Sequence, residues 1–136
     1  MKKEDLMKLG ELIGKTTGDS AFKAELLLHP KKVMENAGIS LSSNLQIKAW
    51  ENQTNEYHIV IPEKPIPENH QVHHVNEESS LEEINRFFVT KWLENGEEKK
   101  KIQKDPMAFL QSFGINPLKQ MKILFHENNE TIFHFV

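Results

Sequence analysis

The chain has 136 residues, of which 38% are hydrophobic and 27% charged, and it contains no cysteine. This length suits one domain, or two half-domains that share a core. The lack of cysteine excludes disulfides, thiol nucleophiles, zinc ribbons and iron–sulfur clusters. No apolar stretch reaches the roughly 20 residues of a membrane helix, and the first residues lack the apolar core of a signal peptide. We therefore expect a cytoplasmic protein without membrane insertion.

The formal charge of −3 arises in the middle of the chain. Residues 1–62 and 79–136 each hold eight basic and eight acidic residues, whereas 63–78 holds one lysine and four glutamates. Prolines in and beside this segment exclude helix and favour extended backbone. We interpret 63–78 as an acidic, proline- and histidine-bearing linker between two blocks. Because no large basic face is predicted, nucleic acid is not an expected partner.

The first block, 1–62, reads as helices followed by strands. A first helix is predicted from apolar residues at helical spacing: Leu6, Leu9, Leu12 and Ile13. A second helix is predicted over residues 19–28, and a short third helix follows Pro30 and ends at Gly38. Alternating residues over 45–49 and 57–61 flank the polar sequence ENQTNE, which predicts a β-hairpin.

The second block, 79–136, has the same order of signals. Its first helix is predicted from Leu81, Ile84, Phe88 and Trp92. Ser80 and Glu83 have capping-box spacing, so this helix begins near Leu81 and ends near Gly96. A charged stretch, 97–104, precedes Asp105, a good N-cap, and the short helix after it ends at Gly114. Strands over 121–125 and 132–136, with ENNE between them, predict a second hairpin.

The two blocks align at an offset of 76 residues, without a gap, over 30–60 and 106–136. The identical pairs include Pro30/Pro106, Gly38/Gly114, Ile39/Ile115, Ile47/Ile123, Glu51/Glu127, Asn52/Asn128, His58/His134 and Val60/Val136. Several fall at turns and helix ends, which favours duplication over chance. We therefore predict an α+β fold of two similar helix–helix–β-hairpin units, related by a pseudo-twofold axis.

One segment also carries a longer ordered pattern. Its helical part contains Ala21, Phe22, Lys23, Leu26, Leu27, Pro30, Val33, Gly38 and Ile39, and its strands contain Ile47, His58, Ile59, Val60, Pro62, Lys64 and Pro65. In this order the segment resembles the nitrile hydratase-like leader peptide family, which is related to the nitrile hydratase alpha subunit. The resemblance implies that 1–62 is a leader-like block with an alpha-subunit-like fold and that 79–136 is its diverged copy.

The resemblance also implies a function. Leaders of this family head ribosomal natural-product precursors of the bacteriocin type and are recognised by peptide-modifying enzymes or a peptidase-transporter. The cysteine metal site of nitrile hydratase cannot be carried over, and neither a Gly-Gly cleavage site nor a core peptide is present. We therefore expect a non-catalytic recognition module without cofactor or metal, whose core peptide is absent. The alternative is a structural or regulatory subunit of a nitrile hydratase-like assembly without an active site. The oligomeric state stays open.

The linker contains three closely spaced histidines that could bind a metal ion: His70, His73 and His74. Histidines in such a segment are usually solvated. A metal-dependent enzyme is therefore the third functional hypothesis, after the recognition module and the structural subunit. His58 and His134 occupy equivalent strand positions without a motif for a nucleophile, so a shared packing or hydrogen-bonding role is expected.

Glutamates, lysines and aromatic residues supply the remaining candidate site residues. Glu51 and Glu127 begin turns, and the lysine run 99–101 is interpreted as an exposed helical face. Trp92 continues an apolar stripe and is assigned to the core. Trp50 and Tyr57 are the candidates for partner binding, because aromatic residues are frequent among binding hot spots.

Overall fold

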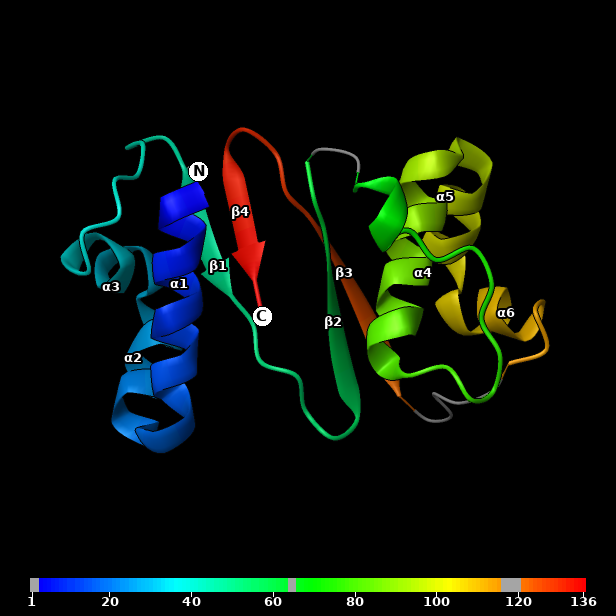
Figure 1. Ribbon diagram of the computed structural model, residues 1–136, viewed down its shortest axis with the longest axis horizontal. Coiled ribbons are helices and arrows are strands. Elements are labelled where there is room, and N and C mark those ends of the chain that lie inside the picture. Colours follow the sequence, from blue (N-terminus) through cyan, green and yellow to red (C-terminus); the bar gives the residue numbers. More distant parts are fainter. Residues whose placement is uncertain (1–2, 64–65, 116–120) are drawn as a thin grey trace. The chain divides into compact units, whose positions relative to one another are not determined.

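The chain divides into two compact units, which we describe separately from a computed structural model of residues 3–63, 66–115 and 121–136 (Figure 1). Unit 1 comprises residues 1–51 and 128–136, and unit 2 comprises residues 52–127. Both contain helices and strands, as expected of an α+β protein. Each unit combines residues of both sequence blocks, so the units do not coincide with segments 1–62 and 79–136.

Unit 1 begins with three helices and a short 3₁₀ turn. Their bounds are α1 (Lys3–Lys15), η1 (Thr16–Gly18), α2 (Ser20–Leu28) and α3 (Pro30–Asn36). The Asp19 side chain caps α2 by accepting a hydrogen bond from the Phe22 N–H (3.0 Å). Pro30 occupies the first turn of α3, as predicted. Gly38 has φ of 91°, which confirms the predicted left-handed residue after this helix.

The sheet of unit 1 joins one strand from each sequence block. Strand β1 (Gln46–Ala49) pairs in parallel with β4 (Ile132–Phe135), and Gln46 lies opposite Ile132. Helices α2 and α3 contact β1, so the apolar side of this small sheet is covered within the unit. The buried core consists of Leu9, Leu12, Leu26, Val33, Met34, Ile39, Ile47 and Phe135.

Unit 2 begins with a strand and continues with helices. Its elements are β2 (Glu56–Ile61), η2 (Glu68–His70), α4 (Leu81–Glu94), α5 (Gly96–Lys104), α6 (Pro106–Gln111) and β3 (Lys122–Glu127). The predicted capping box of Ser80 and Glu83 is present at the start of α4. Asp105 caps α6 by accepting the Ala108 N–H (3.1 Å), and Gly114 has φ of 78°. These three local predictions are confirmed.

Aromatic packing fills the core of unit 2. Strands β2 and β3 are parallel, with Glu56 opposite Lys122 and Ile61 opposite Glu127. Phe87 and Phe88 of α4 are fully buried and contact Phe109 of α6. Trp92 is buried, as predicted, and its ring stacks on Phe125 with centroids 5.1 Å apart. Aromatic side chains of α4, α6 and β3 therefore make up much of this core.

The two predicted hairpins are wrong. The four strands lie where the alternation placed them, but β1 pairs with β4 and β2 pairs with β3, both in parallel. The polar residues between β1 and β2, and those between β3 and β4, carry the chain from one unit into the other. A period of two identifies which face of a strand is buried but carries no information about its partner, so a polar sequence between two strands does not by itself specify a hairpin loop.

The predicted linker is part of unit 2. Ile66, Val72 and Val75 pack against its core, and the Val72 N–H donates to Thr90 Oγ1 (3.1 Å). Apart from the 3₁₀ turn η2 and a turn at residues 77–78, the described part of the segment forms neither helix nor strand. Lys64 and Pro65 lie outside the described residues. Burial of these three apolar side chains holds the mostly polar segment against the core of unit 2.

Among the described residues, no helix combines the length and the apolar character needed to cross a bilayer.

Candidate functional site

Two strand histidines at equivalent positions of the aligned blocks, His58 and His134, make side-chain hydrogen bonds within their own units. His134 of β4 is buried and accepts a hydrogen bond at Nδ1 from Trp50 Nε1 (3.0 Å), and the two rings stack. Because the indole N–H can only donate, His134 Nδ1 carries no proton in this contact. Burial, and then the charge of Lys48, lower the pKa of His134. The neutral imidazole is thus the form that the folded unit favours.

His58 of β2 has a different set of partners in unit 2. Its Nε2 lies 2.9 Å from Glu56 Oε1, and its Nδ1 lies 2.9 Å from His126 Nε2. A carboxylate only accepts, so Nε2 of His58 carries a proton and Nδ1 faces His126 in a contact whose direction depends on the tautomer. The His58 and His126 rings stack, and the His58 side chain is only 3% exposed, so His58 is the buried member of these three groups.

Both histidines are also held through their backbone. Asn52 Oδ1 accepts the N–H of His58 (2.7 Å), and Asn128 Oδ1 accepts the N–H of His134 (2.6 Å). These contacts fit the expected packing and hydrogen-bonding role of the two histidines. Each of these contacts stays within one unit.

Each of the two turn glutamates forms an ion pair within its own unit. Glu51 pairs with Lys23 in unit 1, and Glu127 pairs with Lys99 (3.0 Å) in unit 2. Trp92 Nε1 also donates to Glu127 Oε1 (2.8 Å), and Lys99 Nζ lies 5.5 Å from the Trp92 ring centroid. The hydrogen bond from Lys99, helped by that from Trp92, lowers the pKa of Glu127 despite its partial burial. Lys99 therefore contacts Glu127 and Trp92, whereas the sequence predicted a solvated side chain.

The linker histidines do not converge. His70, His73 and His74 are all exposed, and His73 Nδ1 lies 3.4 Å from Glu94 Oε2. Within the described ranges, no group of three or more His, Asp or Glu side chains is arranged to hold a metal ion. The geometry gives the metal-dependent alternative no support.

The predicted partner-binding residues take part in internal contacts. Trp50 is half-buried against His134. Tyr57 is half-buried on the core of unit 2, and its hydroxyl accepts a hydrogen bond from Asn85 Nδ2 (3.2 Å). His126, which the sequence did not single out, stands 76 residues after Trp50 and contacts the counterpart of His134. Its position at the repeat offset from Trp50 was the sequence signal that could have identified it.

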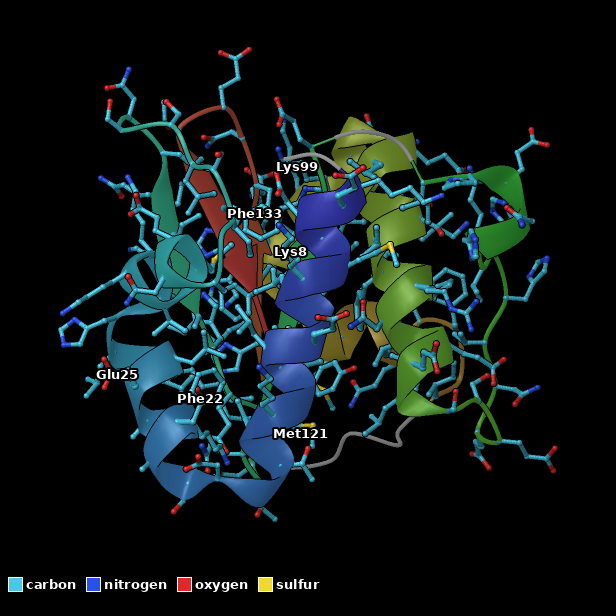
Figure 2. The ribbon with its side chains drawn as sticks, turned by 60° about the vertical axis from the view of Figure 1, so that its left-hand side comes forward. Lys8, Phe22, Glu25, Lys99, Met121 and Phe133 are labelled. Atoms are coloured by element: carbon cyan, nitrogen blue, oxygen red, sulfur yellow. The ribbon has the colours of Figure 1, made fainter. Side chains whose placement is uncertain are left out.

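A groove in unit 1 is the remaining candidate. It has a volume of about 520 Å³ and is lined by residues of α1, α2 and α3 and of the turn before α2. Leu12 and Val33 form a buried apolar floor, Phe22 forms a half-buried wall, and Asp19 and Glu25 are exposed at the edge. Figure 2 shows Phe22 on the side of α2 that faces α1, with Glu25 pointing away. A pocket of about 300–1,000 Å³ is typical of sites for small ligands or side chains.

The sequence did not indicate this groove, because its walls come from three helices whose approach depends on tertiary packing. No protein-family model, curated protein or solved structure matches the chain.

Proposed function

We propose that the chain is a non-catalytic recognition module that binds a segment of another protein in the groove of unit 1. The observation that carries this proposal is the groove itself, which has the apolar residues Leu12 and Val33 at its floor and exposed carboxylates at its edge. An apolar pocket with a few polar groups at its edge is the usual form of a binding site. His58 and His134 are engaged in hydrogen bonds inside their own units, which supports a binding role for the chain rather than a catalytic one.

In its finer form the proposal follows the leader resemblance. The chain would be a leader-like module of a bacteriocin-type pathway, with its core peptide absent, that docks to a peptide-modifying enzyme or a peptidase-transporter in the cytoplasm. Most residues that line the groove lie within the segment that carries the resemblance, and Phe22 and Val33 are among the residues of both. This coincidence supports the groove as the docking surface over Trp50 and Tyr57, whose rings take part in internal contacts.

We further propose that the two units are copies produced by duplication of one half-chain. Their contacts recur at the same offset of 76 residues: Asn52–His58 with Asn128–His134, Lys23–Glu51 with Lys99–Glu127, and Gln46 opposite Ile132 with Lys122 opposite Glu56. Strand registers and side-chain pairs both follow this offset, which supports duplication more strongly than the sequence identities do.

Affinity purification of the tagged full chain from its native cell, followed by mass spectrometry, tests the proposed function. We expect recovery of a peptide-modifying enzyme or a peptidase-transporter. Glu25→Lys, which reverses a charge at the groove edge, should weaken that recovery, whereas Glu35→Lys, at an exposed position of α3 outside the groove lining, should not. Recovery of a metal-bearing subunit in a fixed hetero-oligomer would contradict the proposal and favour a structural subunit. Recovery of neither enzyme class would also contradict it.

A further inference from the structure

Strands of both sequence blocks, 1–62 and 79–136, complete each compact unit. Strand β1 of the first block pairs with β4 of the second, and β2 of the first block pairs with β3 of the second (Figure 1). Side chains also join the blocks, because Trp50 Nε1 donates to His134 Nδ1 (3.0 Å) and Asn85 Nδ2 donates to the Tyr57 hydroxyl (3.2 Å). Each block therefore presents a surface that the other block covers.

The surface between the blocks is apolar at its centre. Phe135 of the second block lies in the core of unit 1 with Leu26 and Met34, and Ile59 of the first block lies in the core of unit 2 with Phe88. Met34, Ile59 and Phe88 are fully buried. Burial of apolar area is the main favourable term in protein association. A block from a second copy of the chain would bury the same side chains, because its sequence is identical.

The turn η2 lies in the segment that joins the blocks. It is closed by two backbone hydrogen bonds, from the His70 N–H to the Pro67 carbonyl oxygen (2.9 Å) and from the Gln71 N–H to that of Glu68 (3.1 Å). Gln71 Nε2 also donates to the carbonyl oxygen of Ile66 (3.3 Å). The three residues of η2 are exposed, so opening the turn breaks these local bonds and removes none of its own side chains from a core.

The residues after η2 stay with the second block. The Val72 N–H donates to Thr90 Oγ1 of α4 (3.1 Å), and Val75 packs against the core of unit 2. Residues 67–71, which we call the hinge, are therefore the place where the chain can pass from one copy to another while the contacts of Val72 and Val75 are kept.

We propose that two copies of the chain exchange blocks through the hinge, so that the first block of each copy pairs with the second block of the other. The turn η2 opens, and the strand pairs and core contacts between blocks are made again between copies. Hydrogen bonds such as that from Trp50 to His134 then join different copies. This inference rests on the observed strand pairing and does not depend on the proposed recognition function.

Protein concentration decides between the closed chain and the exchanged dimer. Within one copy, a short linker keeps its two ends at an effective concentration on the order of 1 mM. The blocks of a folded copy separate only when both units unfold, so exchange requires unfolding and refolding. We expect refolding from urea at about 1 mM protein to yield dimer, and refolding at about 10 μM to yield monomer, by size-exclusion chromatography with light scattering.

An engineered disulfide shows which copy supplies each strand, because the chain has no cysteine of its own. Gln46 of β1 lies opposite Ile132 of β4, and paired strands lie close enough for a disulfide. A chain with Gln46→Cys and a chain with Ile132→Cys are unfolded together, refolded at about 1 mM and then oxidised. We expect a disulfide-linked dimer of the two chains. The Gln46→Cys chain alone should give none, and a chain with both substitutions should close the disulfide internally when refolded at about 10 μM.

The length of the hinge provides a second test. Deletion of residues 68–70 shortens the connection within one copy and should lower the concentration needed for dimer about tenfold or more. Insertion of Gly-Ser-Gly-Ser after His70 should yield no more dimer than wild type. A dimer without the disulfide between copies would overturn the inference, because it would show association through other surfaces. Monomer alone after refolding of the wild-type chain at about 1 mM would also overturn it, whether or not the deletion variant folds.

Discussion

His58 and His134 are buried at equivalent positions, yet their side chains meet different partners. His58 lies between a carboxylate and a second imidazole, whereas His134 accepts from an indole. An indole N–H donates to neutral imidazole but not to imidazolium at the same nitrogen. The Trp50 contact, together with burial, therefore links the stability of unit 1 to the charge state of one residue.

The lowered pKa of His134 predicts a loss of stability at acidic pH. The unfolded chain takes up a proton near its ordinary pKa of about 6.5, whereas folded His134 resists protonation, so the free energy of unfolding falls as pH drops through that region. Urea denaturation at pH 7.5 and 5.5 should show a smaller difference for His134→Gln than for wild type. His70→Gln, at an exposed histidine, should keep the wild-type difference, and an equal effect of the two variants would contradict the assignment.

Lys99 should contribute more to stability than its counterpart Lys23. Both pair with a turn glutamate, but only Lys99 also lies over a tryptophan ring. An exposed ion pair contributes about 0.2–1 kcal/mol and an exposed cation–π contact about 0.5–1 kcal/mol. We expect Lys99→Ala to cost about 1 kcal/mol in the free energy of unfolding, and Lys23→Ala to cost no more than about 0.5 kcal/mol. Equal losses in denaturant titrations would show that the ring adds nothing.

At the scale of elements, local signals predicted where helices and strands begin but not how strands pair. The capping box at Ser80 and the left-handed glycines were readable because their hydrogen bonds lie within a few residues. The pairing of β1 with β4 joins residues more than 80 positions apart, and alternation cannot select such a partner. The groove was missed for the same reason, since Leu12, Phe22 and Val33 meet only when three helices pack.

Asn52 and Asn128 should stabilise the strands that follow them. Each side-chain oxygen accepts the N–H of a buried histidine, so removing it leaves a buried donor unsatisfied at a cost of about 1–3 kcal/mol. Asn128→Ala and Asn52→Ala should therefore lower the free energy of unfolding by this amount. The variants to aspartate keep an acceptor oxygen and should lose much less. Hydrogen exchange at the amides of His58 and His134 should quicken only in the alanine variants; unchanged exchange there would contradict the role.

For the whole molecule, the strand pairing makes each compact unit depend on residues of both sequence blocks. Residues 1–51 require β4, and the helices α4 to α6 require β2. Each core therefore contains side chains from both sequence blocks, such as Phe135 beside Leu26 in unit 1 and Ile59 beside Phe88 in unit 2. A cut in the segment between the blocks would interrupt the backbone without removing any of these contacts.

This arrangement predicts that the chain survives cleavage between Glu77 and Glu78, two exposed residues where a specific protease site can be inserted. The fragments, residues 1–77 and 78–136, should elute together in size-exclusion chromatography and appear as a 1:1 complex by native mass spectrometry. They should separate only in denaturant, because separation exposes the apolar residues of both cores. Two independent hairpin units would instead yield two separate folded fragments, and that result would contradict the parallel pairing of β1 with β4 and of β2 with β3.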